Sequence, residues 1–211
     1  MKIFRSGKPV LARADVEVVE KTVPFQGYFR VDRYKFRHRL FGGGWSGEMT
    51  REVFERGHAV AVLPYDPLRD EVVLIEQFRA GAYAAERGPW LVEIVAGIVE
   101  AGEAHEDVAR REAKEEAGLD MGALAFVCDY IASPGAMTHS VKVYIGRVDA
   151  EGAGGLFGLP EEHEDIRVDV VPFADAMTLM RIGRIQDAAG IIALQWMALH
   201  RAELRRAWGV P

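Results

Sequence analysis

The chain has 211 residues, of which 49% are hydrophobic and 27% charged, and this composition is typical of one globular domain, with or without an appendage. Its formal net charge of −6 argues against a nucleic-acid partner, because long-range attraction to phosphate needs a basic surface. No apolar run approaches the length of a membrane span and no apolar signal core stands at the N-terminus, so we expect a cytoplasmic protein without a membrane partner.

A separate antiparallel β region is expected in residues 1–55. Apolar and polar residues alternate, with the period of half-buried strands, in segments 16–20, 28–36 and 48–54. Two or three strands bury too little apolar surface to be stable alone. We therefore expect this region to pack on the main domain or on a second subunit through aromatic residues such as Tyr28 and Phe29. Stacking on a nucleotide base is the alternative role for these aromatics.

The main domain is expected to span residues 56–211. It should begin with two buried strands, 57–64 and 72–77, joined by a turn rich in proline and aspartate. Arg79 follows the second strand. A loop is expected next, over 81–89, and then a single apolar strand over 90–95.

A loop and a short acidic helix are expected after this strand. Gly97 and Gly102 indicate a loop in which the backbone turns tightly. Acidic residues crowd the first turn of the helix, where the helix dipole favours negative charge. Gly118 stands where the helix should end.

The carboxylates of this helix suggest a site for a divalent metal ion. Glu112 and Glu116 share one helix face because they are four residues apart, and Glu115 lies beside them. Like charges at this spacing disfavour an isolated helix, and a hard cation such as Mg²⁺ would offset that effect. A solvated acidic helix face is the alternative interpretation.

The rest of the chain is expected to contain strands 124–132, 141–148 and 166–171, followed by helices 173–180 and 188–208. Asp187 is expected to cap the last helix. The polar, glycine-rich passage 149–165 is too long for a plain connector, which indicates a functional loop. Strands on both sides of a central helix, with helices at the end, predict an α/β (α+β) fold in which a mixed sheet is sandwiched between helices.

Residues 97–119 follow one spaced pattern, and this pattern resembles the Nudix box. Its fixed positions are Gly97, Glu103, Arg111-Glu112, Glu115-Glu116, Gly118 and Leu119. So many defined positions over this length are far more specific than a lone glycine motif. The resemblance implies a Nudix-type fold and the hydrolysis of a nucleoside diphosphate linked to another group.

The same resemblance implies the roles of single residues. Glu112 and Glu116 would hold the metal, Glu115 would assist, and the backbone carbonyl of Ala96 would add a ligand. Glu103 and Arg111 would pin the loop to the helix by a salt bridge. Mg²⁺ is the expected ion, and Mn²⁺ is able to replace it.

Stretches outside the box resemble the ADP-ribose pyrophosphatase branch of this family. Residues 91–97 lead into the box as in that branch, Pro134 stands 15 positions beyond Leu119, and 158–168 resembles its catalytic loop. This resemblance implies cleavage of ADP-ribose to AMP and ribose 5-phosphate. The expected substrate contacts are Tyr28, Phe29, Arg51, Arg79, Ser133 and Pro134. Two alternatives stay open: a hydrolase of another nucleotide sugar such as GDP-mannose, and a non-catalytic module that senses ADP-ribose.

The acidic loop 161–164 is expected to supply the general base. By the resemblance, Glu162 is the first candidate and Glu164 the second, and an acidic surface loop is the alternative. His139 stands where branch members commonly carry a glutamate, which puts a metal- or substrate-contacting role there in doubt; an exposed polar loop residue is the other interpretation.

Branch members are built as dimers with exchanged N-terminal regions, so the resemblance also implies a homodimer. Such an arrangement would place Tyr28 or Phe29 of one subunit near the adenine pocket of the other.

Overall fold

The computed structural model describes residues 10–210, apart from the side chain of Glu162. The described residues form two compact units. One unit contains residues 10–56 and 133–139, and the other contains 57–132 and 140–210. The loop 133–139, which the sequence places inside the main domain, therefore belongs to the first unit.

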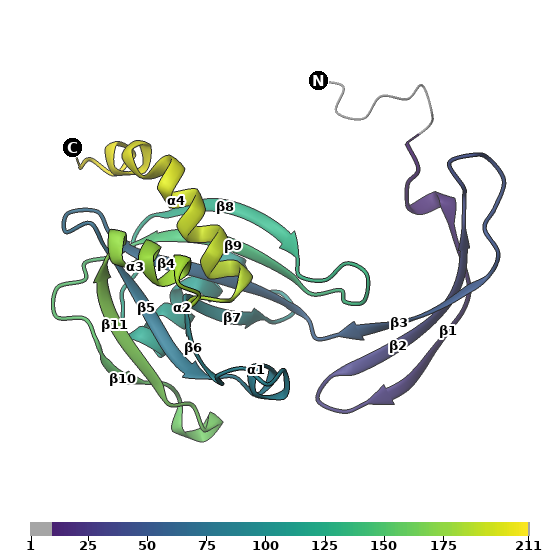
Figure 1. Cartoon of the computed structure of the whole chain (residues 1–211), viewed down its shortest axis with the longest axis horizontal. Coiled ribbons are helices and arrows are strands. Elements are labelled where there is room, and N and C mark those ends of the chain that lie inside the picture. The colour runs from purple at the N-terminus through teal and green to yellow at the C-terminus, as the bar shows by residue number, and fades with distance from the viewer. Residues whose placement is uncertain (1–9, 211) are drawn as a thin grey trace. The chain divides into compact units, whose positions relative to one another are not determined.

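The first unit is built on a three-stranded antiparallel sheet in the order β1-β2-β3 (Figure 1). Its elements are the short 3-10 helix η1 (Arg13–Asp15), β1 (Val16–Gln26), β2 (Arg30–His38) and β3 (Met49–Glu55). The antiparallel strands expected in this region are confirmed. β1 extends well past residue 20, because it pairs with β2 as far as Gln26 through two register shifts that interrupt the alternation in its sequence.

Charge rather than apolar packing dominates this sheet. No hydrophobic side chain is buried within residues 10–56, and every residue of β1 is exposed. The one buried residue of that segment is Asp32, which forms ion pairs with Lys21 at 2.7 Å and with Arg30 at 2.8 Å. Other ion pairs of the sheet, such as Arg33–Glu52 and Arg37–Glu17, are exposed, and exposed pairs stabilise a fold by only about 0–1 kcal/mol each. With no buried apolar residue to add to them, this sheet has little intrinsic stability.

The second unit is built on an eight-stranded mixed sheet. Its strands are β4 (His58–Asp66), β5 (Glu71–Phe78), β6 (Trp90–Glu93), β7 (Val95–Val99), β8 (Leu124–Ile131), β9 (Ser140–Arg147), β10 (Gly155–Phe157) and β11 (Ile166–Pro172). The main path runs β10-β11-β5-β4-β9-β8, and only β4 and β9 are parallel. β4 and β5 pair with each other at one end only; at the other end β4 pairs with β7 and β5 with β6.

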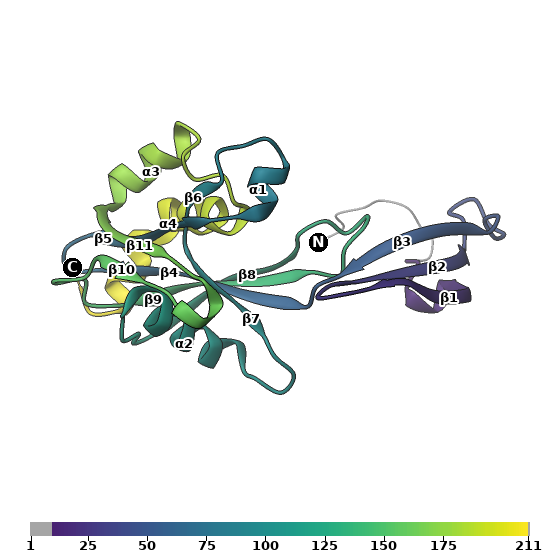
Figure 2. The same ribbon diagram turned by 90° about the horizontal axis from the view of Figure 1, so that it is seen from below.

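Helices cover both faces of this sheet, as the sequence predicts (Figure 2). The helices are α1 (Ala80–Ala84), α2 (His105–Ala117), α3 (Phe173–Arg181) and α4 (Ala188–Ala207), with the 3-10 helix η2 (Pro160–Glu162) between β10 and β11. β4 alternates between the two cores: Val60 and Val62 pack beneath α2, whereas Ala61 and Leu63 pack beneath α4. Among the described residues, no helix combines the length and the apolar character needed to cross a bilayer.

The prediction of a single strand over 90–95 is wrong, because the chain forms two strands there, β6 and β7. β6 pairs with β5, whereas β7 pairs with β4. Between them, Ile94 turns into the core beneath α4, while Val95 joins the core beneath α2. Apolar periodicity did not reveal this change of partner.

Gly97 also differs from its expected place in a turn, because it lies within β7 opposite Val60. A Cβ atom at this position would lie 1.9 Å from Oε1 of Glu112, so glycine is required for the close approach of that side chain. Gly102 does turn the chain, with φ of +93°, and Gly118 ends α2 with φ of +67°.

Candidate active site

Helix α2 presents Glu116 to the backbone of β7. The residue is only 4% exposed, and its Oε2 accepts a hydrogen bond of 3.1 Å from the backbone N–H of Ala96. Burial raises the pKa of Glu116 to about 8; the N–H of Ala96 lowers it, while the charges of Glu112 and Glu164 raise it further. The contact brings the backbone of Ala96, the expected carbonyl ligand, beside this carboxylate.

Glu112 lies one turn earlier on the same helix face and rests over Gly97. Its Oε1 is 2.9 Å from Nη1 of Arg111, and its side chain is largely buried. Burial raises the pKa of Glu112 to about 7; Arg111 lowers it, and the charges of Glu115 and Glu164 raise it. The helix period therefore brings together two carboxylates that are costly to ionise.

Arg111 connects this helix face to the preceding loop. Its Nη1 lies 3.0 Å from Oε2 of Glu115, and its Nε lies 3.8 Å from Oε1 of Glu103, which is the ion pair expected from the sequence. Glu103 in turn accepts a hydrogen bond of 2.8 Å from the N–H of Glu100. Loop and helix are thus fixed to each other around the carboxylates.

The loop before β11 contains Glu164, whose charge raises the pKa of both Glu112 and Glu116. Gly158 adopts φ of +103°, and a Cβ there would lie 2.9 Å from Cβ of Glu164, so the loop closes tightly at this point. Oε2 of Glu164 accepts from the N–H of Leu159 at 3.5 Å. The side chain of Glu162, the first candidate for the base, lies outside the described residues.

Arg79 directly follows β5 and is held by Glu93, whose Oε2 lies 2.7 Å from Nε of the arginine. The charge of Arg79 lowers the pKa of Glu116, so the guanidinium favours the ionised form of that carboxylate. The sequence singled out Arg79 but missed Glu93. The signal was present, because Glu93 is a charged residue inside the apolar run Leu91–Val95.

The donor set fits a hard divalent cation. Carboxylate and carbonyl oxygens are the ligands that Mg²⁺ prefers, and a cation relieves the cost of ionising buried carboxylates. Within the described residues, no three His, Cys, Asp or Glu side chains already converge on one metal position. Arg111 contacts one oxygen of Glu112, and the N–H of Ala96 contacts one oxygen of Glu116.

The remaining expected substrate contacts belong to the first unit. Tyr28 is 87% exposed and packs edge-on against Phe29, with the ring centroids 4.8 Å apart. Phe29 in turn packs on Phe54 and lies under the guanidinium of Arg56. An exposed aromatic of this kind is able to stack on a nucleotide base.

Other residues of the first unit lie in its edge strand and loop. Arg51, in β3, is exposed and donates from Nη1 to the backbone oxygen of Thr50 at 2.8 Å. Ser133 and Pro134 begin the exposed turn 133–136. His139, at the end of this loop, is only 7% exposed, so the interpretation as an exposed loop residue is wrong.

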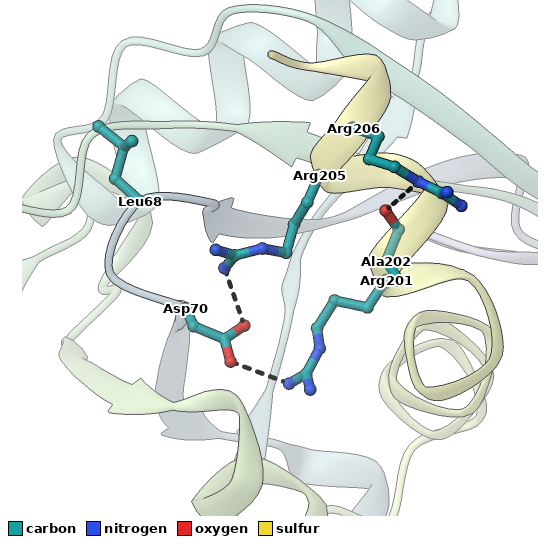
Figure 3. Close-up of a pocket in the computed structure, with 6 residues that line it drawn as sticks. All are labelled: Leu68, Asp70, Arg201, Ala202, Arg205 and Arg206. Carbon is teal, nitrogen blue, oxygen red and sulfur yellow. Dashed lines mark hydrogen bonds and ion pairs between the residues drawn. The ribbon is translucent and has the colours of Figure 1, made fainter. Parts of the chain in front are cut away.

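A cavity of about 600 Å³ lies elsewhere in the second unit and is lined by Leu68, Asp70, Arg201, Ala202, Arg205 and Arg206. Arg201 and Arg205 point from α4 toward Asp70, at 3.1 and 3.8 Å, whereas Arg206 turns back toward Ala202 (Figure 3). Asp70 precedes β5 and Arg79 follows it, so roughly 30 Å of extended chain separates these two residues.

Known proteins resemble this chain over most of its length. The family described as NUDIX domain matches residues 55–195. The ADP-ribose pyrophosphatase of Escherichia coli strain K12 is 50% identical over 194 residues, which cover 92% of this chain and 93% of that protein. The ADP-ribose pyrophosphatase of Haemophilus influenzae is 42% identical over 200 residues, covering 93% and 92% of the two chains.

Two further proteins bear on specificity and on fold. The GDP-mannose pyrophosphatase of Pectobacterium atrosepticum is 32% identical over 181 residues, covering 85% of this chain and 92% of that protein. A crystal structure described as an ADP compounds hydrolase superposes with a TM-score of 0.71 over 90% of this chain and 97% of that chain. At 19% identity this last likeness shows the fold alone.

Proposed function

The chain belongs to the NUDIX family, and from this premise we propose that it hydrolyses the pyrophosphate of ADP-ribose to AMP and ribose 5-phosphate. The observation that carries the proposal is the pair of carboxylates, Glu112 and Glu116, which α2 holds against the backbone of Ala96 and Gly97. The choice of ADP-ribose is supported by 50% identity to the ADP-ribose pyrophosphatase of E. coli, against 32% to a GDP-mannose pyrophosphatase.

We propose that the reaction requires a divalent metal, namely Mg²⁺, with Mn²⁺ able to replace it. Glu112, Glu116 and the carbonyl of Ala96 would hold it. When bound, the metal neutralises pyrophosphate oxygens and lowers the pKa of an attacking water. Glu115 has a helping role in this proposal, since Arg111 keeps its carboxylate beside the ligands.

The loop 158–164 supplies the general base in this proposal. Glu162 is the first candidate and Glu164 the second, as the family resemblance implies. The negative charge of Glu164 raises the pKa of both Glu112 and Glu116, which supports a role for the loop at this site. A base here would take the proton of the attacking water.

Arg79 binds the pyrophosphate in this proposal. A guanidinium is always charged and forms paired hydrogen bonds with phosphate oxygens. Arg51, Ser133 and Pro134 would add contacts from the first unit.

We also propose a homodimer in which the N-terminal regions are exchanged. The absence of any buried hydrophobic side chain in residues 10–56 supports this, because such a sheet needs a second surface to be stable. Tyr28 or Phe29 of one subunit would then stack on the adenine bound by the other.

Product analysis from a panel of nucleoside diphosphate derivatives tests the proposed substrate. With Mg²⁺ present, we expect ADP-ribose to give AMP and ribose 5-phosphate, with a higher kcat/KM than GDP-mannose or NADH. A higher kcat/KM for GDP-mannose would make the chain a hydrolase of another nucleotide sugar. Tight binding of ADP-ribose without any turnover in Mg²⁺ would instead identify a sensing module.

A further inference from the structure

We infer that Glu93 and Asp187 are positioning residues for Arg79: Glu93 binds Nε of its guanidinium, Asp187 adds a negative charge near this pair, and the two terminal nitrogens are left for the pyrophosphate. The inference rests on the proposed function, because it takes Arg79 to be a phosphate ligand. It concerns two acidic residues from separate elements, the strand β6 and the start of α4.

Glu93 reaches Arg79 from the neighbouring strand. It stands opposite Ile75 in the ladder between β5 and β6, and Ile75 belongs to the core beneath α2, so Glu93 points to the same face of the sheet as that helix. Its Oε2 lies 2.7 Å from Nε of Arg79. Burial raises the pKa of Glu93, and the charge of Arg79 lowers it.

This contact leaves the outer edge of the guanidinium unoccupied. Among the described residues, neither terminal nitrogen of Arg79 takes part in a hydrogen bond or an ion pair. The backbone is fixed as well, since the N–H of Arg79 donates to the carbonyl of Pro89 at 2.7 Å. A guanidinium held at Nε presents its two terminal nitrogens as a fork that matches a phosphate group.

Asp187 supplies a second carboxylate. Its Oδ2 caps α4 by accepting from the N–H of Gly190 at 2.7 Å, while its buried Oδ1 has no hydrogen-bond partner among the described residues. Burial raises the pKa of Asp187, and the N–H of Gly190 and the charge of Arg79 lower it. The charge of Asp187 also raises the pKa of Glu93, so Asp187 acts on the Glu93–Arg79 pair through its charge; among the described residues it makes no hydrogen bond or ion pair with either of them.

The segment before α4 fixes Asp187 in place. Ile185 is fully buried and bridges to Val92 of β6. On either side of it, Arg184 contacts Glu76 at 3.1 Å and Gln186 accepts from Arg87 at 2.8 Å. A platform held on both sides is what the positioning of a charged group requires, since a misplacement of about 1 Å costs on the order of 100-fold in rate.

A double-mutant cycle tests the inference. Glu93→Ala should lower kcat/KM for ADP-ribose about tenfold in the wild-type background and less than about twofold when Arg79 is replaced by alanine, because Glu93 acts through Arg79. Glu93→Gln, whose amide oxygen still accepts from Nε, should restore most of the loss. A role confined to folding would give no such dependence on Arg79.

Asp187→Ser tests the second carboxylate without removing the helix cap, since serine is also a good N-cap residue. We expect about a threefold loss of kcat/KM that again disappears in the Arg79→Ala background. Asp70→Asn is the matched control: it removes a half-exposed carboxylate that pairs with arginine at the other end of β5 (Figure 3), and it should leave kcat/KM unchanged. Asparagine also tolerates the positive φ of this position.

Removal of Arg79 leaves the buried carboxylate of Glu93 unpaired, so Arg79→Lys serves as a second background that keeps the charge but lacks the fork. Equal effects of Glu93→Ala in all backgrounds would overturn the inference. The same cycle is run on the dissociation constant of ADP measured by calorimetry. Failure of the wild type to hydrolyse ADP-ribose would thus contradict the proposed function, while the coupling for ADP would still decide the role of Glu93 and Asp187.

Discussion

Glu116 is the residue on which the proposed chemistry depends most, because it is buried on α2 and contacts the backbone of Ala96, the other expected metal ligand. Glu116→Gln keeps the hydrogen bond from Ala96 but removes the charge that a divalent cation needs. We predict that kcat falls by about 10²–10³-fold or more while the fold is retained, since several kcal/mol of transition-state stabilisation are lost. Steady-state kinetics together with circular dichroism measure both effects. A folded variant with near-normal turnover would exclude Glu116 as a ligand.

The raised pKa of Glu116 also predicts that the stability of the metal-free wild type depends on pH. In the absence of metal, the pKa of Glu116 in the folded chain is about 8, above its ordinary value of 4.5, so the folded state favours the protonated form. Its contribution to stability is therefore complete below pH 4.5 and is lost as pH rises through about 8. In EDTA, the melting temperature of the wild type should fall more between pH 6 and 9 than that of Glu116→Gln. Parallel curves for the two proteins would contradict this.

Single residues also show what the sequence was able to predict. Glu112 and Glu116 were predicted to share a face, because the helix period is a local property. The sequence alone indicates a turn at Gly97. It does not distinguish a glycine at which the backbone turns from one that leaves space for a side chain distant in sequence. Glu93 was missed, because its partner Arg79 meets it only through pairing of β5 with β6.

At the scale of elements, the loop between β10 and β11 contains both candidates for the general base, and substitutions distinguish between them. Glu162→Gln should lower kcat by about 10²–10⁴-fold and leave KM largely unchanged, as expected for loss of a general base. Glu161→Gln, an exposed neighbour in the same loop, is the matched control and should have little effect. If Glu162→Gln raises KM alone and Glu164→Gln lowers kcat, Glu164 is the base.

Elements that a local sequence pattern determines are predictable from the sequence. Elements whose bounds depend on which strands pair with each other are less predictable. The acidic helix and the cap at Asp187 are confirmed, because caps and helix period are written in adjacent residues. The division of 90–95 into β6 and β7 was not foreseen, since it depends on the divergence of β4 from β5. The passage 149–165 contains a short strand and η2, which lie too close to turns to show a period.

At the scale of the whole molecule, the sheet of the first unit needs a second surface. The boundary predicted at residue 55 stays a prediction, and the loop 133–139 groups with the first unit through contacts such as the 2.8 Å hydrogen bond from Phe54 to the carbonyl of Ala136. A segment from the middle of the chain thus helps to hold β3. This long-range contact explains why a boundary drawn from sequence order alone left the loop in the other part.

The last prediction concerns assembly. Light scattering on the full chain should give the mass of a dimer at micromolar concentration, because β1 exposes apolar side chains such as Val23 and Phe25 that a monomer leaves in water. Phe25→Glu should weaken the dimer, since a charge would have to be buried in the interface. Leu199→Glu changes an apolar residue on α4 that is even more exposed, and it should leave the dimer intact.

Activity provides an independent measure of the same assembly. If Tyr28 or Phe29 stacks on the adenine bound by the other subunit, then dilution that dissociates Phe25→Glu should also raise its KM for ADP-ribose, because an aromatic contact with a base is worth about 1–3 kcal/mol. Leu199→Glu should show no dependence of KM on protein concentration. A wild-type chain that scatters as a monomer at micromolar concentration and remains fully active would contradict both the exchanged dimer and the shared pocket.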